Sequence, residues 1–207
     1  VLLLAIHLWR NAQKNPLGVS TASIRVSLAV AVVCLIFAPA ARVWHDATWR
    51  ANHRVENPTQ VPLTMAEEAN GPANPFFPSS ATTTTGEIIP SDFFLTSETC
   101  GRCHRDIYDQ WNASVHHFSS FNNQWYRKSI EYMQDVVGTE PSKWCAGCHD
   151  HAVFFNGQFD RPIRDQIDTP EAQAGLGCTS CHSIVHVGST MGQGDFVIEY
   201  PPLHDLA

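Results

Sequence analysis

Apolar residues are distributed unevenly along the chain. From Ile24 to Trp44 the sequence reads IRVSLAVAVVCLIFAPAARVW, and the apolar run from Val26 to Ala41 is interrupted only by Ser27 and Pro39. A helix that crosses a bilayer needs roughly 17 to 25 mostly apolar residues. We therefore predict a transmembrane helix over residues 24–45. A cleaved signal peptide is the alternative, because Ala-x-Ala-like residues follow the apolar stretch.

A shorter apolar stretch, VLLLAIHLW, precedes this run, and a segment carrying Arg10, Lys14 and Arg25 separates the two. Short loops rich in Lys and Arg stay in the cytoplasm. We predict that residues 1–23 hold the end of a first transmembrane helix and a cytoplasmic loop. The rest of the chain then lies on the outer, periplasmic face of a bacterial cytoplasmic membrane.

Residues 46–95 show no sustained helical or strand period. They contain Pro58, Pro62, Pro72, Pro75, Pro78 and Pro90 and a run of threonines. Such a composition favours extended, solvated backbone. We predict a periplasmic linker, or a strap that lies on a partner protein, since the paired phenylalanines of NPFFP and DFF would otherwise face solvent.

Helical spacing returns in residues 96–207. Apolar residues recur at spacings of four and three in CHRDIYDQWNASVHHFSS, which predicts a helix through Ile107, Trp111, Val115 and Phe118. A second helix is predicted over QWYRKSIEYMQDVVG, with Gly138 as its C-cap. Strand alternation is weak and confined to GDFVIEYPP. We predict a mainly α, loop-rich domain that continues past Ala207.

The charge changes sign along the chain. Before Asn52, five basic residues face one acid; from Asn52 onward, eight basic residues face nineteen acids, and the net charge is −7. Nucleic-acid binding depends on basic surfaces that neutralise phosphates. We therefore expect no nucleic-acid partner for the acidic domain.

One cysteine motif occurs three times, as CGRCH, CAGCH and CTSCH. Zinc ribbons use Cys-x-x-Cys pairs without a fixed next residue, and a thioredoxin-like pair would occur once. A histidine directly after the second cysteine indicates c-type haem attachment, in which two thiols hold the haem and the histidine binds its iron. We predict three covalently bound haem c groups. Their attachment residues are Cys100, Cys103, Cys145, Cys148, Cys178 and Cys181, and their proximal iron ligands are His104, His149 and His182.

Five further histidines are candidates for the distal position on the opposite face of a haem. In falling order they are His116, His186, His151, His204 and His117. On a continuous helix, His116 would lie roughly 18 Å beyond its own motif, and His186 would share a face with His182. His151 is two residues from His149, too near to reach round the same macrocycle. We therefore expect distal ligands to be exchanged between motifs. Met191 and Met133 are alternative ligands that would raise the potential.

The stretches CGRCHRDIYDQWNASVHHFS, CAGCHDH and GLGCTSCHSIVHVGSTMGQGDFVIEYPP resemble the multihaem cytochromes related to the tetrahaem cytochrome c-554 of nitrifying bacteria. The resemblance covers residues 97–202. It implies that His116, in the pattern Ser-x-His-x-x-Ser, is a distal ligand. It also implies a fourth haem attachment motif, which lies beyond Ala207 or has been lost. The family's CHDP reads CHDH here, so His151 departs from the pattern.

Together these features predict a membrane-anchored periplasmic multihaem c-type cytochrome that transfers electrons between redox partner proteins as a subunit of a membrane complex. An acidic surface favours docking to a basic partner. Two alternatives stay open. One is a haem enzyme of the nitrogen-oxide or hydroxylamine type with one open iron site, and the other is a mainly structural subunit. No acid–base constellation stands out in the sequence, so we predict no catalytic residues.

Overall fold

The structure is a computed structural model, which describes Ile6, Arg10, residues 21–69 and residues 71–201. The chain divides into two compact units, Val1–Arg54 and Val55–Ala207. The described elements are α2 (Thr21–Asn52), α3 (Met65–Glu68), β1 (Thr82–Thr83), η1 (Ser91–Leu95), α4 (Ser97–Gly101), α5 (Arg105–Asn112), η2 (His117–Ser119), α6 (Gln124–Val137), α7 (Thr139–His149), α8 (His151–Phe154), η3 (Gln158–Asp160), η4 (Ile163–Asp165), α9 (Pro170–Gln173), α10 (Cys178–His182), β2 (Ile184–Val187) and β3 (Phe196–Ile198).

Helix α2 is, within the described residues, the one helix long and apolar enough to cross a membrane. Its most apolar 18-residue window has a mean hydropathy of 2.2. By length and composition alone, such a helix fits both a membrane span and a signal sequence. The first span predicted in residues 1–23 falls almost entirely outside the described residues.

The observed helix α2 extends beyond the predicted span of residues 24–45. Side-chain contacts one turn apart explain the extension into polar sequence. The guanidinium of Arg42 pairs with the carboxylate of Asp46 at 3.1 Å, and the rings of Trp49 and His53 stack with centroids 4.5 Å apart. Pairs at this spacing stabilise a helix.

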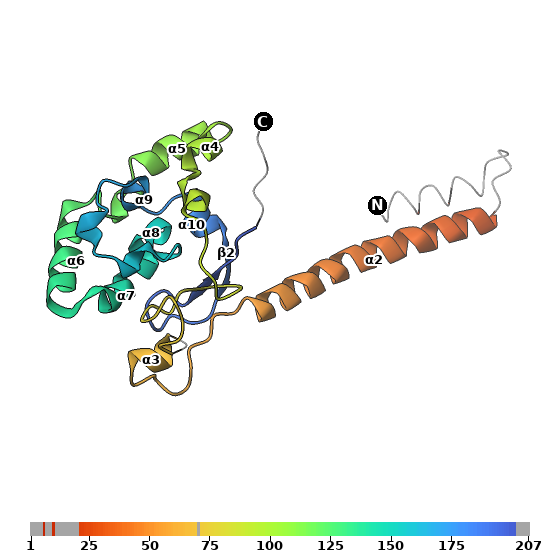
Figure 1. The fold of residues 1–207 in the computed structure, drawn as a ribbon. Helices are drawn as coiled ribbons and strands as arrows, with labels where there is room; N and C mark the ends of the chain where they lie inside the picture. The colour runs from red at the N-terminus through yellow and green to blue at the C-terminus, as the bar shows by residue number, and fades with distance from the viewer. Residues whose placement is uncertain (1–5, 7–9, 11–20, 70, 202–207) are drawn as a thin grey trace. The chain divides into compact units, whose positions relative to one another are not determined.

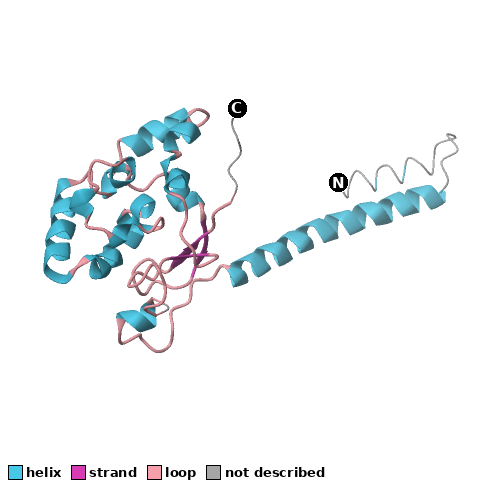
Figure 2. Cartoon of the chain, in the orientation of Figure 1, coloured by secondary structure: helices cyan, strands magenta, loops and turns pink. Residues whose placement is uncertain are grey.

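The second unit consists of short helices joined by long loops, with one small sheet (Figure 2). Strand β3 is central in the sheet, parallel to β1 and antiparallel to β2. The mainly α, loop-rich fold predicted from the sequence is confirmed, and the weak strand pattern of GDFVIEYPP does form β3.

The core of the second unit is aromatic. Phe76, Phe154 and Phe155 are almost fully buried, and their ring centroids lie 4.9 to 5.4 Å apart. Phe93 and Phe94 are buried as well, and the ring of Phe94 stacks on that of Phe155 at 5.8 Å. Edge and tilted contacts of this kind add to the free energy of burial.

The Pro- and Thr-rich segment from Val55 to Leu95 belongs to this second unit. This differs from the linker or strap predicted over residues 46–95. The sequence predicted that the paired phenylalanines of this segment contact a partner protein. In the structure most of them are buried in the core of the chain itself. The backbone N–H of Ser80 also donates to the carbonyl of Gln193 at 2.9 Å, which ties the segment to the loop before β3.

The helix predicted through Phe118 is wrong in its second half, because α5 ends at Asn112. Residues outside the helix form hydrogen bonds with polar atoms of its last turn. The indole N–H of Trp111 donates to the carbonyl of Leu176 at 2.7 Å, and Nδ1 of His117 donates to the carbonyl of Asn112 at 2.9 Å.

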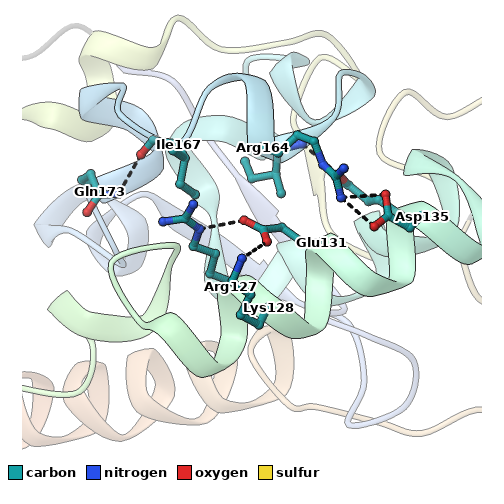
Figure 3. A network of polar contacts seen from close by, with 9 residues as sticks. Arg127, Lys128, Glu131, Asp135, Arg164, Ile167 and Gln173 are labelled. Carbon is teal, nitrogen blue, oxygen red and sulfur yellow. Dashed lines mark hydrogen bonds and ion pairs between the residues drawn. The ribbon is translucent and has the colours of Figure 1, made fainter.

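Helix α6 is confirmed as predicted, from Gln124 to Val137 with Gly138 (φ +87°) at its C-cap. Its outer face carries ion pairs (Figure 3). Glu131 accepts hydrogen bonds from Lys128 and Arg127, the latter at 2.7 Å, and these bonds lower the pKa of Glu131. Asp135 pairs with Arg164 at 2.6 Å, which links α6 to η4.

Candidate functional site

Each Cys-x-x-Cys-His motif forms one helical turn. The second motif is the last turn of α7, and the third motif is the whole of α10. In the first motif, the backbone N–H groups of Cys103 and His104 both donate to the carbonyl of Cys100, at 3.3 and 3.1 Å. Residues three apart on a helix share a face. The two thiols of each motif therefore lie on the same side of their turn.

The thiols are available for attachment, because all seven cysteines of the chain are free. In each motif the first cysteine is half-buried and the second is exposed. Burial raises the pKa of the Cys145 and Cys148 thiols, although a hydrogen bond from Gln193 to Cys148 acts in the opposite direction for that residue.

The imidazole of His149 is held on two sides. Its Nδ1 donates to the backbone carbonyl of Ser119 at 2.7 Å, and the ring of Tyr126 stacks on it with centroids 4.3 Å apart and planes 14° apart. A hydrogen bond at one ring nitrogen fixes the tautomer and leaves the other nitrogen for a metal. Nε2 of His149 is thus the ring nitrogen available to a metal.

A cavity of about 540 Å³ lies beside this second motif. Cys148, His149 and His116 line it together with apolar residues that include Val115 and Phe118. Val115 and Phe118 are 79% and 49% exposed, which is unusual for large apolar side chains beside a cavity. The volume is within the range of cofactor sites, and a flat apolar ring would cover these side chains.

A buried carboxyl group lies directly behind His149. Asp150 is 1% exposed and accepts hydrogen bonds from the hydroxyls of Ser120 and Tyr126. Burial raises the pKa of Asp150 to about 7, although the two hydrogen bonds act in the opposite direction. Burial, and next the charge of Asp150, raise the pKa of Tyr126 well above its usual value. Sequence reasoning missed this group, because only the fold brings α6 and the end of α7 together.

The first and third motifs meet in space. Burial, followed by the charge of the neighbouring Cys178 thiol, raises the pKa of Cys100. The backbone N–H of Cys178 also donates to the hydroxyl of Ser97 at 3.2 Å, which joins α10 to α4. Both helices lie on the same side of the second unit in Figure 1.

The candidate distal histidines are not gathered at one point. His116 lines the cavity of the second motif, and its carbonyl accepts the backbone N–H of Leu176 at 2.9 Å. Gly175 has a φ of +64°, and a side chain there would collide with the backbone carbonyls of His116 and His117. Glycine at this position therefore allows the third motif's segment to lie against the segment that carries both histidines.

His117, next to His116, donates from Nδ1 to Asn112, and its ring lies 4.5 Å from that of Trp111. His186 lies on strand β2 and is exposed. His186 therefore does not share a helical face with His182, contrary to the prediction, because α10 ends at His182. His204 lies outside the described residues. The alternative ligands Met133 and Met191 are half-buried, on α6 and in the loop before β3.

His151 is buried away from the cavity of the second motif. It is 4% exposed, and its Nε2 donates to the carbonyl of Gly147 at 2.8 Å. The rings of Phe94, Phe155 and Phe196 surround it. Burial lowers the pKa of His151 to about 4. The neutral imidazole thus serves as a core residue that hydrogen-bonds the turn of its motif.

Free thiols paired on one face, an imidazole with Nε2 available and an apolar cavity beside it together fit haem c. Such motifs are typical of c-type cytochromes, which transfer electrons through covalently bound haem. The family model described as Cytochrome c554 and c-prime matches residues 99–183, a segment that contains all three motifs. The match covers less than half of the chain, and over these residues it confirms the resemblance seen in the sequence. Comparison with curated proteins and with solved structures gave no match.

Proposed function

We propose that the chain is a membrane-anchored, periplasmic cytochrome with three haems, which passes electrons between redox partner proteins as part of a membrane complex. Haem c supplies, when bound, an iron that takes up and releases one electron at a time. The observation that carries the proposal is that three complete attachment motifs lie in one compact unit and interlock.

Contacts join all three attachment motifs to one another. The helices of the first and third motifs are in contact, and the backbone N–H of Cys178 in α10 donates to the hydroxyl of Ser97 in α4. The second is joined to the third through Ser119, whose carbonyl accepts from His149 and whose hydroxyl accepts the backbone N–H of Leu176 at 3.1 Å. Leu176 is two residues before the third motif. Contacts between the three motifs would bring their haems close together. This favours haems that exchange electrons with one another over haems that act separately.

His116 is the distal ligand that this arrangement favours, and we assign it to the haem of the third motif. Ser119 binds the Nδ1 side of His149, which is the side away from the iron, and the hydroxyl of Ser119 donates to the carbonyl of His116 at 2.7 Å. These bonds hold the backbone of His116 beside His149. The carbonyl of His116 also accepts the backbone N–H of Leu176, which brings His116 next to the third motif and supports the assignment.

The membrane anchor and the docking to a partner protein are supported by the charge distribution and by α2. The basic residues before α2 and the apolar composition of that helix support an anchor with the haem domain outside the cytoplasm. The excess of acids from Asn52 onward supports docking to a basic surface of the partner protein.

The test uses the full chain, produced in a host that attaches haem and purified in detergent. Intact mass is expected to show three haems on the chain, and proteolytic peptides to place one on each motif. Electron paramagnetic resonance of the oxidised protein is expected to show only low-spin iron. A high-spin signal that shifts with nitrite, nitric oxide or hydroxylamine would overturn the electron-carrier proposal in favour of an enzyme.

A further inference from the structure

Tyr126 touches the iron-binding histidine of the second motif on one side and a buried acid on the other. Its ring stacks on His149, and its hydroxyl donates to Asp150. We propose that Tyr126 is a positioning residue for His149, and that its anchor on Asp150 sets the orientation of the axial imidazole. The inference rests on the proposed haem at the second motif.

Two contacts of different kinds restrain the imidazole. The hydrogen bond from Nδ1 to Ser119 (2.7 Å) fixes the direction in which Nε2 points. That bond alone still permits rotation of the ring plane about its own direction. The stacked ring of Tyr126, 14° from parallel, removes this rotation. Positioning a metal ligand through such outer contacts is a general feature of metal sites.

Tyr126 can act in this way because its own position is fixed. It lies in the first turn of α6, where the side-chain oxygen of Asn123 accepts the backbone N–H of Tyr126 at 3.4 Å. The ring of Phe121, which is 2% exposed, also stacks with that of Tyr126, at 5.4 Å and 23°. The aromatic ring therefore has packed neighbours besides His149.

The anchor at the hydroxyl end is built into α7. Asp150 follows His149 directly, and its backbone N–H donates to the carbonyl of Ala146 at 2.9 Å. Its two carboxylate oxygens are each occupied, one by the hydroxyl of Tyr126 and the other by the hydroxyl of Ser120, which is fully buried. The helix that carries His149 thus also holds the ring that orients it.

Tyr126 is expected to affect only the haem iron of the second motif. The orientation of an axial imidazole plane determines the g-values of low-spin iron, and outer hydrogen bonds tune its potential. The described contacts of Tyr126 reach the histidine of the second motif and no other motif histidine. Loss of the positioning should therefore change one haem of the three.

The experiment compares Tyr126→Leu, which removes the ring, with Tyr126→Phe, which keeps the ring and removes the anchoring hydroxyl. Tyr132→Leu is the matched control on the same helix, because Tyr132 is 72% exposed. All three variants are made in the full chain with haem attached. Haem number is read from intact mass, iron symmetry from electron paramagnetic resonance, and the midpoint potentials from a redox titration.

We expect Tyr126→Leu to keep three haems while one low-spin signal moves and one midpoint potential shifts, and Tyr126→Phe to change the same signal by less. The control should match the unmodified protein. Unchanged g-values and potentials in Tyr126→Leu would overturn the inference. Should that variant fail to fold, an unchanged spectrum and potentials in Tyr126→Phe would overturn it instead. Absence of haem from Cys145 and Cys148 in the unmodified chain would overturn the proposed function, and this inference with it.

Discussion

His116, His117 and His151 differ in the atoms that their imidazoles have available. His116 lines a cavity, and no hydrogen bond of its ring is found among the described contacts. His117 is restrained through Nδ1 by Asn112 and lies against Trp111. His151 is enclosed by phenylalanines, and its Nε2 donates to Gly147, while its Nδ1 is buried without a hydrogen-bond partner. Exposure and hydrogen bonding therefore favour His116 over His151 as a ligand.

Replacing these histidines one at a time tests the distinction. We expect His116→Met to keep three haems but to change the spin state or the potential of one, because a thioether replaces an imidazole or the position stays open. His117→Met and His151→Leu are the matched controls and should leave the spectra of all irons unchanged. His151→Leu should cost about 1 to 3 kcal/mol of stability, since the Gly147 carbonyl loses its donor. A changed iron signal in His151→Leu, or none in His116→Met, contradicts the assignment.

At the scale of single residues, the sequence predicts what local spacing determines. Two thiols and a histidine within five positions form one turn wherever the motif lies, so Cys145, Cys148 and His149 are evident without a structure. Tyr126 and Asp150 are not, because their contact joins α6 to the end of α7. The fate of His151 likewise depends on phenylalanines from three separate segments.

At the scale of elements, the segment from Val55 to Leu95 shows that a high proline content does not by itself indicate an exposed linker. Prolines limit regular helix in this segment to the short elements α3 and η1, but they do not prevent burial of the residues between them. Phe76 and Phe93 anchor the segment in the core, and Lys143 of α7 adds a polar contact. Its ammonium donates to the carbonyl of Pro75 at 3.1 Å and pairs with Asp160, and its side chain is only 11% exposed.

Lys143→Met tests this contact, because methionine keeps the length of the side chain and removes the donor. The Pro75 carbonyl then loses its partner, which should weaken the local structure by about 1 kcal/mol. Amide hydrogen exchange around Phe77 and Ser79 should accelerate roughly fivefold. Lys128→Met instead removes the ion pair between the exposed Lys128 and Glu131 of α6, away from this segment, and should leave its exchange unchanged. Equal exchange rates in the two variants would show that aromatic burial alone holds the segment.

Helix ends were predictable where the capping residue is local and unpredictable where it is not. Gly138 ends α6 through its own backbone conformation, as the sequence indicated. The end of α5 at Asn112 depends instead on Leu176, which accepts from Trp111 across the fold. An apolar period of four and three continues past Asn112, but the tertiary contacts override it.

For the whole molecule, hydropathy indicates where the chain can cross a membrane, and the charge on either side of that helix indicates its orientation. Basic residues precede α2, and the acidic, cysteine-rich part follows it. Because short basic loops stay in the cytoplasm, the haem motifs are expected outside. The membrane anchor and a cleaved signal sequence remain physically distinct outcomes, since only an anchor keeps the haem domain in the membrane fraction.

Membrane fractionation and protease access together test both parts of this arrangement. Alkaline carbonate washing should leave the haem-stained chain in the membrane pellet, because an apolar helix of this length partitions into the bilayer. Trypsin added to intact spheroplasts should shorten the chain or release a soluble haem-stained fragment, since exposed Arg50 and Arg54 follow the apolar run. The same protease should leave the haem domain intact in inverted vesicles. Release by carbonate would favour a signal sequence, and protection in spheroplasts with cleavage in inverted vesicles would reverse the orientation.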